Sequence, residues 1–552
     1  MESTPDHASS NSPSLWVGAG LGALSSLAAI GLMFLGDRLF SFPFVPFDIF
    51  DWMARTLPGG LIAFVTRTMT TIIGFFQGFL PIGDTSTVAK LAEQSIAILQ
   101  LIGGGIVFGV VLAWLGRDKK QDLVRAGQIG GLILLAVTLL IESSLAFSAI
   151  GTLGALWLAL LFVGWGWILG WLVGESAQAQ DDDPAAPMSR RQFLTVSGAG
   201  LSAVALGAWG LGKLFGEDAV IANDDGGLAL NGDDPFGTEL TSGPAASPSA
   251  EALAARRAPI DGTRAELTAT EDFYRIDINT RPPSINGDSW RLAISGLVDQ
   301  PLELSLADLQ RYPSQTQILT MQCISNPVGG DLTSSARWTG VRFKDILEDA
   351  GIQSSAAGAL ISSVDGFFEF VVMEDIIDER TLLVYEMNSE TLTVEHGFPL
   401  RIYIPNRYGM KQPKWINSIQ LVEERVDGYW VERGWSREAR PQTVSVVDTV
   451  ALDLDESGKG SALCGGIAWA GGRGISQVEV QVDESGWQSA ELITPPLSPL
   501  NWVLWRYEWP YEGGRHNLSV RAYDANGELQ ALDSRAPRPD GATGIHQISV
   551  NI

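Results

Sequence analysis

The sequence has very few of the residues that bind metals or crosslink a chain. Its 552 residues include only two cysteines and four histidines. Two cysteines cannot build a disulfide framework, and so small a set of cysteines and histidines excludes zinc and iron–sulfur ligand sets. Any redox chemistry must therefore come from a cofactor that needs very few protein ligands.

Positive charge is also scarce. The chain has 37 Lys and Arg residues against 63 Asp and Glu residues, a net charge of −26. A surface of this sign repels polyanions, so we exclude nucleic acid as a partner. Hydrophobic residues make up 46% and charged residues only 18%, which excludes a disordered chain. The length predicts more than one domain.

Long uncharged runs fill the N-terminal part. Residues 8–36 and 94–116 carry no charge, and 128–174 contain only Glu142. A bilayer core is crossed by roughly 20 apolar residues in a helix. Buried helices of a soluble protein are the less favoured alternative, because several such runs occur in series. We predict a membrane region over residues 1–215 with about six spans, near 15–35, 60–80, 96–115, 129–148, 151–173 and 194–214.

Two features of this region need a separate interpretation. Arg67 lies within the second span, and we interpret it as a residue that snorkels to the interface, because an arginine at mid-bilayer is costly. The aromatic segment 44–53 is typical of an interfacial or re-entrant piece.

Basic residues predict the orientation. The most basic short connection is 117–125, so we place it in the cytoplasm, which puts Arg190 and Arg191 on the same side. The segment 189–194 (SRRQFL) resembles a twin-arginine export signal at an internal position. The alternative is an ordinary sixth helix after two cytoplasmic arginines. Both interpretations predict a multi-pass protein of the bacterial cell membrane whose C-terminal half lies outside the cytoplasm.

A single cysteine stands at the most distinctive point of the C-terminal half. Residues 216–260 are typical of a flexible linker. Further on, Cys323 follows a predicted strand at 316–322 and precedes a turn-forming stretch, NPVGG. There a thiolate can face a ligand. Taken alone, a lone cysteine is more often a buried apolar residue, and a Cys–His nucleophile with His396 also stays open.

The segment 317–331 (QILTMQCISNPVGGD), followed by 335–341 (SARWTGV), resembles the molybdopterin-binding oxidoreductase family of sulfite oxidase. The resemblance covers roughly residues 265–435. It implies an α+β molybdopterin domain, assigned to 261–438, that catalyses oxygen-atom transfer to or from a small substrate. The other matching pieces occur in the expected order: FYRID (273–277), WRL (290–292), GLV (296–298), YEMN (385–388), EHGFPLR (395–401), YGMK (408–411) and KW (414–415).

The resemblance also implies a molybdenum–molybdopterin cofactor with one cysteine thiolate on the metal. Cys323 is then the metal ligand and the catalytic residue. Arg401 and Lys414 are expected to bind the cofactor as cations. Arg401 lies in an apolar run, where a charge without a partner is costly. For the other candidates a structural role is an equal alternative. The residues expected to bind the cofactor are Tyr274, Asn326, Arg337, His396, Arg401 and Lys414.

One departure from the family pattern bears on the substrate. Sulfite oxidases have an arginine soon after the ligand cysteine, whereas residues 324–328 (ISNPV) carry no cation. The pattern therefore does not favour sulfite. A sulfoxide, another small oxyanion and an N-oxide stay open as substrates.

The last part of the chain predicts a β-sandwich. Alternating stretches such as 478–482 and 518–522, separated by turn residues, indicate an all-β, immunoglobulin-like domain over 439–552. It resembles the domain through which sulfite oxidases dimerise, so a homodimer is one alternative. Cys464 is expected to be a structural residue here, without a disulfide to Cys323.

The route of the electrons is the least defined feature. None of the four histidines falls in a predicted span, which excludes a bis-histidine haem in the bilayer. We therefore expect the membrane region to anchor the enzyme to the lipid bilayer, with a quinone or a separate electron carrier as its partner. The alternative function is a binding or sensor module that retains the molybdopterin-domain fold without catalysis.

Overall fold

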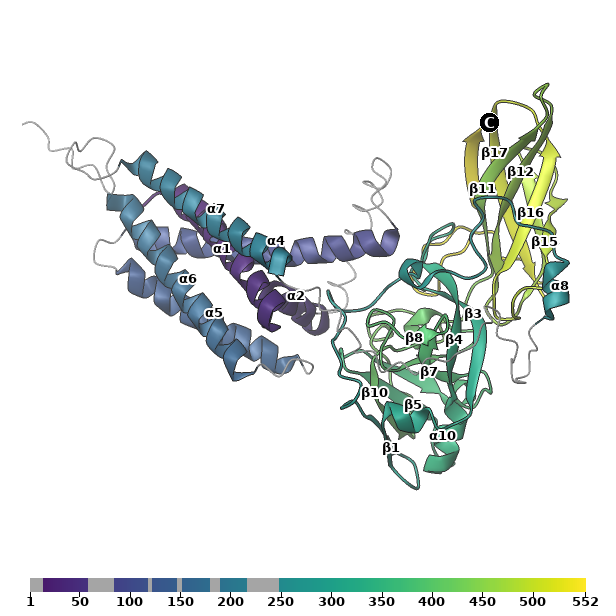
Figure 1. Ribbon diagram of the computed structural model, residues 1–552, viewed down its shortest axis with the longest axis horizontal. Helices are drawn as coiled ribbons and strands as arrows, with labels where there is room; N and C mark the ends of the chain where they lie inside the picture. The colour runs from purple at the N-terminus through teal and green to yellow at the C-terminus, as the bar shows by residue number, and fades with distance from the viewer. Residues whose placement is uncertain (1–12, 58–83, 118–121, 146–150, 179–188, 216–247) are drawn as a thin grey trace, which may run out of the picture. The chain divides into compact units, whose positions relative to one another are not determined.

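The computed structural model describes residues 13–57, 84–117, 122–145, 151–178, 189–215 and 248–552 (Figure 1). They form two compact units, which we describe separately. Of the described residues, the first unit comprises 13–57, 89–117, 122–145, 151–178, 189–215 and 279–281, and the second comprises 84–88, 248–278 and 282–552.

The first unit is helical. Five helices in the described part of the chain are long and apolar enough to cross a membrane, in agreement with five of the predicted spans. The remaining predicted span, 60–80 with Arg67, lies outside the described residues. The segment predicted to be interfacial forms a short helix that begins at a proline-containing first turn. The helices are α1 (Leu15–Phe40), α2 (Val45–Thr56), α4 (Thr85–Leu115), α5 (Leu123–Ser144), α6 (Thr152–Gln178) and α7 (Arg190–Phe215).

Glycines allow these helices to pack closely. A Cβ atom on Gly127 of α5 would overlap with the carbonyl of Gly166 on α6, and a Cβ atom on Gly166 would overlap with the carbonyl of Gly127. Gly22 of α1 and Gly105 of α4 meet in the same way. Small residues at helix contacts are typical of membrane proteins, where close backbone approach replaces the hydrophobic driving force.

The second unit begins with two sheets and short helices, which match the predicted α+β domain. One sheet has the strand order β2-β1-β10-β5-β6, and the other has the order β3-β4-β7-β8, with β9 paired to β7. Between them lies an apolar core to which α10 (Phe343–Ala350) contributes four residues at helical spacing. The strands are β1 (Leu292–Gly296), β2 (Leu302–Leu304), β3 (Ser314–Gln322), β4 (Thr333–Arg342), β5 (Gly358–Ser363), β6 (Phe368–Val372), β7 (Leu382–Met387), β8 (Glu390–Thr391), β9 (Arg401–Tyr403) and β10 (Ile416–Val422).

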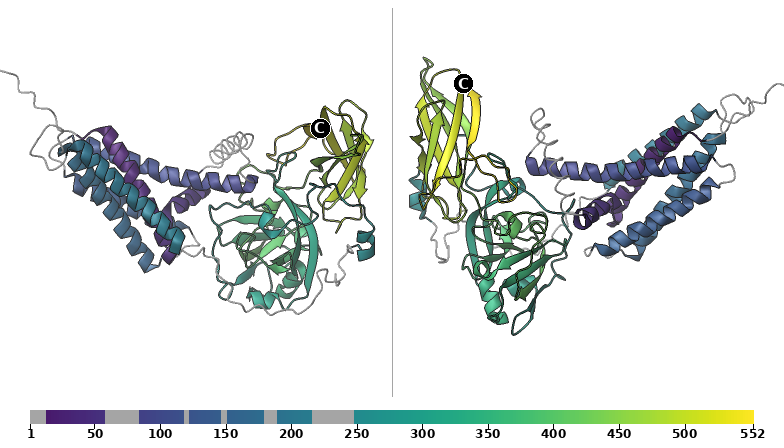
Figure 2. Two further views of the ribbon diagram at one scale, coloured as in Figure 1. Left: turned by 45° about the horizontal axis from the view of Figure 1, so that its top comes forward. Right: turned by 180° about the vertical axis from the view of Figure 1, so that it is seen from behind.

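Two four-stranded antiparallel sheets form the C-terminal β-sandwich (Figure 2). The sheet orders are β11-β12-β16-β15 and β14-β13-β17-β18. Their inner faces share one core, in which Cys464 and Trp505 of the first sheet meet Val480 and Leu518 of the second. The strands are β11 (Val444–Leu454), β12 (Gly460–Trp469), β13 (Ile475–Val482), β14 (Gln488–Ser489), β15 (Glu491–Ile493), β16 (Val503–Pro510), β17 (Arg515–Asp524) and β18 (His546–Asn551).

The predicted strands are confirmed, whereas the domain boundaries stay predictions. β3 covers the strand expected at 316–322, and β13 and β17 cover those at 478–482 and 518–522. Most of the predicted linker lies outside the described residues. Near its end, Ser249 caps a one-turn helix, α8 (Ala250–Ala254).

A buried ion pair secures the short helix η2 (Gly409–Lys411). The Lys411 Nζ lies 2.7 Å from the Glu369 carboxylate, whose side chain has no exposed surface. Burial raises the pKa of Glu369, and the charge of Lys411 opposes that shift. The pair therefore depends on both partners, because a buried charge that loses its counterion pays a large desolvation penalty.

Replacing Lys411 should reveal this dependence. We expect Lys411→Met to destabilise the protein by about 3–5 kcal/mol, because it leaves the Glu369 carboxylate buried without its cation. The melting temperature of the detergent-purified protein should then fall by roughly 2–4 °C for each kcal/mol. Lys344→Met is the control, since Lys344 pairs with the half-exposed Glu379. Equal effects of the two substitutions would contradict the interpretation.

Candidate functional site

Cys323 lies at the base of a closed loop between β3 and β4, which we call the Cys323 loop (323–332). The Cys323 N–H donates to the Leu332 carbonyl at 2.9 Å, and the Leu332 N–H donates to the Asn326 Oδ1 at 3.0 Å. Both cysteines of the chain are free and buried in the structure.

The Cys323 thiol is nearly enclosed. The residue is 8% exposed, and its Sγ lies 3.0 Å from the Ser325 Oγ. Burial raises the pKa of the thiol, so the neutral form is favoured in the protein alone. A metal cation reverses that preference, because coordination removes the proton from a thiol.

Arg401 places a buried positive charge near the end of β3, the strand that precedes Cys323. It begins β9, its guanidinium carbon lies 4.7 Å from the centre of the Trp338 ring, and its Nη1 donates to the His396 carbonyl at 3.0 Å. Its Nη2 lies 3.6 Å from the sulfur of Met321, which lies near the end of β3, two residues before Cys323. In the described part of the chain, no carboxylate forms an ion pair with Arg401.

Burial lowers the pKa of Arg401 to about 10, so the guanidinium is still charged at neutral pH. A buried charge without a counterion is costly. The geometry around Arg401 therefore fits an anionic group of a ligand.

His396 and Tyr274 lie beside this guanidinium. The His396 Nε2 is 2.9 Å from the Thr270 carbonyl, so this nitrogen carries the hydrogen. Burial, reinforced by Lys414 and Arg401, lowers the pKa of His396 to about 3, which keeps the ring neutral. The Tyr274 hydroxyl contacts Gly409, and burial raises its pKa, so it stays a hydrogen-bond donor.

Two further cations, Lys414 and Arg275, share one carboxylate near His396. The Lys414 Nζ and the Arg275 Nε each lie 3.3 Å from the same oxygen of Asp277. Lys414, Arg401 and Arg275 all lower the pKa of His396 through their charges, so the three cations lie near its ring. Clustered guanidinium and ammonium groups bind phosphate well. Arg275 is not among the residues predicted from the sequence, although it lies inside the FYRID motif (273–277) that carries part of the resemblance.

The remaining two candidates differ from this group. The Asn326 amide oxygen is engaged within the Cys323 loop itself. Arg337 is half-buried on the face of β4 opposite to Trp338, because successive side chains of a strand alternate. The structure therefore brings Cys323, Tyr274, His396, Arg401 and Lys414 together, and it does not bring Arg337 to them.

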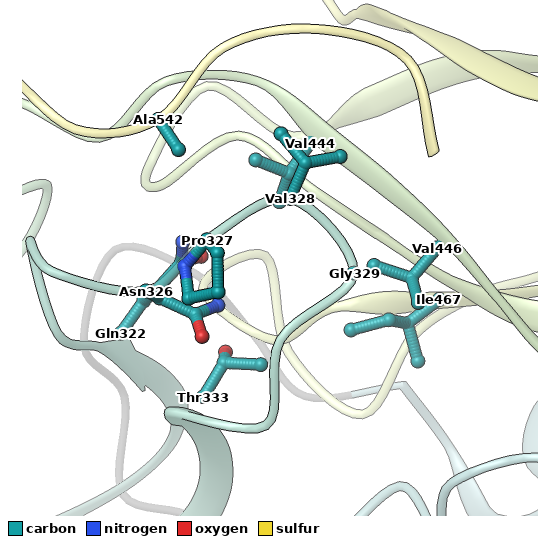
Figure 3. A pocket seen from close by; sticks show the side chains of 10 residues that line it. All are labelled: Gln322, Asn326, Pro327, Val328, Gly329, Thr333, Val444, Val446, Ile467 and Ala542. Carbon is teal, nitrogen blue, oxygen red and sulfur yellow. The ribbon is translucent and has the colours of Figure 1, made fainter. Parts of the chain in front are cut away.

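A small cavity lies on the sandwich side of the Cys323 loop (Figure 3). Asn326, Pro327 and Gly329 line it from the loop, and Val446 and Ile467 line it from the sandwich. Cys323 is not among the lining residues, so the cavity separates the back of the loop from the sandwich and is not the metal position.

Comparisons with known proteins agree with this geometry. Residues 279–430 match the oxidoreductase molybdopterin binding domain. The chain is 34% identical over 152 residues to the uncharacterized oxidoreductase YuiH of Bacillus subtilis, covering 28% of this chain and 75% of that protein. It is 27% identical over 303 residues to rat mitochondrial sulfite oxidase, covering 46% of this chain and 55% of that protein. The chain thus spans about half the length of that relative.

A solved structure, the sulfane dehydrogenase SoxCD from Paracoccus pantotrophus, aligns with 58% of this chain and 95% of its own, at 18% identity and a TM-score of 0.46.

The chain is therefore a molybdenum-dependent oxidoreductase. It belongs to the sulfite oxidase family of molybdopterin-binding oxidoreductases, and its cofactor is molybdenum–molybdopterin. The predicted family, enzyme class and cofactor are confirmed. The described residues fit this cofactor, because they offer one enclosed thiol and a buried cation without an ion-pair partner among them, both near the hydroxyl of Tyr274. The individual site residues stay predictions.

Arg401 provides a test of that fit. We expect Arg401→Met to lower the bound pterin by roughly tenfold or more, measured by fluorescence after oxidative release, because the anionic part of the cofactor would lose a buried cationic partner. In cofactor-free protein the same substitution should leave the melting temperature unchanged or raise it, since an uncompensated buried charge is removed. Arg337→Met is the control and should retain the cofactor. A large stability loss in cofactor-free Arg401→Met would contradict the anion-binding role.

Proposed function

We propose that this protein is a membrane-anchored oxidoreductase that transfers an oxygen atom to or from a small substrate outside the cytoplasm. The single observation that carries the catalytic part is that the buried hydroxyl of Tyr274 lies near both the enclosed thiol of Cys323 and the buried charge of Arg401. A retained fold without catalysis gives no reason for this combination of a buried thiol and a buried cation.

Each residue of the site has a distinct role in this proposal. The bound molybdenum supplies the two-electron, oxygen-atom-transfer chemistry. The Cys323 sulfur holds the metal, and the Ser325 hydroxyl donates a hydrogen bond that offsets the thiolate charge. Arg401 and Lys414 hold the anionic part of the cofactor, and the neutral His396 and the protonated Tyr274 orient it by hydrogen bonds.

The segment after the cysteine does not favour sulfite. Residues 324–330 carry no cationic side chain, so this segment offers no charge to bind the sulfite anion. We therefore infer that the substrate is a sulfoxide, an N-oxide or a small oxyanion other than sulfite.

The membrane part of the proposal is supported by the five apolar helices and by the basic residues around them. α7 begins with the pair Arg190-Arg191 and presents a largely exposed apolar surface, as expected for a helix in lipid. Export through a twin-arginine route suits a domain that binds its cofactor before it crosses the membrane. Because the five helices contain no histidine, a quinone or a separate electron carrier is the inferred electron partner.

We also infer that the sandwich is of the immunoglobulin type. Its two sheet orders correspond to strands ABED and C′CFG of that fold, which supports the inference.

Loss of the metal ligand should abolish turnover. The assay measures the reduction of a panel of sulfoxides and N-oxides by an artificial electron donor. We expect the rate to fall to background in Cys323→Ser, while the circular dichroism spectrum stays unchanged. Cys464→Ser is the control and should retain turnover, since Cys464 lies in the sandwich core. Wild-type turnover in Cys323→Ser would refute the role. Activity on sulfite alone would contradict the substrate assignment.

The export signal should respond to conservative substitution. Replacing Arg190 and Arg191 by lysine keeps the positive charge but removes the guanidinium pair. We expect residues 248–552 to become inaccessible to a protease added outside spheroplasts. Unchanged accessibility would indicate that α7 crosses the membrane as an ordinary span.

A further inference from the structure

The Cys323 loop is held from its sandwich side by Arg264. The Arg264 Nη2 donates to the Gly330 carbonyl at 3.3 Å. The same guanidinium forms an ion pair with Asp448 of β11, with 3.0 Å between the Nε and the Oδ1, and the Arg264 N–H donates to the other carboxylate oxygen at 3.1 Å. Only 6% of the Asp448 side chain is exposed. One arginine thus joins the loop to a fixed point of the sandwich.

His546 holds the neighbouring position of the loop. Its Nδ1 accepts a hydrogen bond from the Val447 N–H at 3.1 Å, which fixes the orientation of the ring. The other edge of the ring lies against Gly329, where an added Cβ atom would overlap with it. Gly329 has a φ of +76°, so both the turn and the contact require glycine there.

Both contacts start from one irregularity of β11. The pairing of β11 with β12 shifts register between Val447 and Thr449, so Asp448 is the extra residue of a β-bulge. A bulge redirects a side chain that a regular strand would point elsewhere. Here it directs the Asp448 carboxylate to Arg264, while Val447 binds His546.

We propose that Arg264 and His546 are positioning residues for Cys323. The inference rests on the proposed role of Cys323 as the metal ligand. Gly329 and Gly330 make the tip of this loop intrinsically adaptable. Hydrogen bonds within the loop join Asn326 to both ends and Gly330 to Pro327, but they do not fix the loop relative to the sandwich. Contacts from the sandwich to residues 329 and 330 therefore determine where the loop, and with it the sulfur, is held. The sandwich acts as a support for the metal ligand.

The test uses full-length, detergent-purified enzyme and a readout on the metal. We expect Arg264→Met and His546→Ala to retain molybdenum but to change the Mo(V) electron paramagnetic resonance signal, by shifted g values or by a second species. Turnover should fall by roughly tenfold or more, as for other residues that orient metal ligands. Asp448→Asn, which is nearly isosteric, should give the same change in weaker form and serves if Arg264→Met does not fold.

Arg257→Met is the matched control. Arg257 lies seven residues before Arg264 in the chain and also pairs with a carboxylate of the sandwich, Glu491. This pair is exposed and does not involve the β11 bulge. Its Mo(V) signal and turnover should equal those of the wild type. Wild-type signals in Arg264→Met, His546→Ala and Asp448→Asn would overturn the proposal.

The two proposals fail differently. If Cys323→Ser retains the wild-type Mo(V) signal, the ligand assignment fails, and the positioning role fails with it. If Cys323→Ser loses that signal while the Arg264, His546 and Asp448 variants keep it, only the positioning role is overturned.

Discussion

The uncompensated charge of Arg401 is the constraint on which the site depends. A guanidinium packed on Trp338, with only a carbonyl and a sulfur as partners among the described residues, is stable in this position when an anion completes it. The elements around it are arranged accordingly. β9 pairs with β7, and the Arg401 side chain reaches Met321 near the end of β3. Arg275 and Lys414 share one carboxylate near His396. The result is a positive, largely enclosed surface next to a single thiol.

The Cys323 loop, which carries this thiol, belongs to the first fold and contacts the C-terminal sandwich. Its base is closed by hydrogen bonds within the first fold, and its glycine tip contacts the sandwich through Arg264 and His546. The apolar cluster of Ile324, Tyr408 and Trp502 continues across the same boundary. The C-terminal sandwich therefore contributes to the surroundings of the cysteine, although it supplies none of the predicted cofactor-binding residues.

The helical unit and the oxidoreductase unit follow different physical rules. In the first, glycine pairs such as Gly127 and Gly166 allow the helices to approach, and long apolar faces stay exposed. In the second, alternating apolar residues close two cores between sheets, and buried charges such as Glu369 and Lys411 occur in pairs. This contrast explains why the overall composition, with 46% hydrophobic and 18% charged residues, resembles neither a soluble domain nor a simple membrane protein.

Local patterns were sufficient for the elements and for the family. Uncharged runs predicted five described helices, and alternation predicted β3, β13 and β17, because periodicity depends only on neighbours in the chain. Scattered motifs predicted the cofactor and its single cysteine ligand. The placement of Arg337 on the opposite face of β4, the sharing of Asp277 by Arg275 and Lys414, and the contacts of Arg264 and His546 with the Cys323 loop were decided by the tertiary structure alone. They join residues that are up to 217 positions apart in the case of Gly329 and His546, and no short-range pattern records which distant strands will meet.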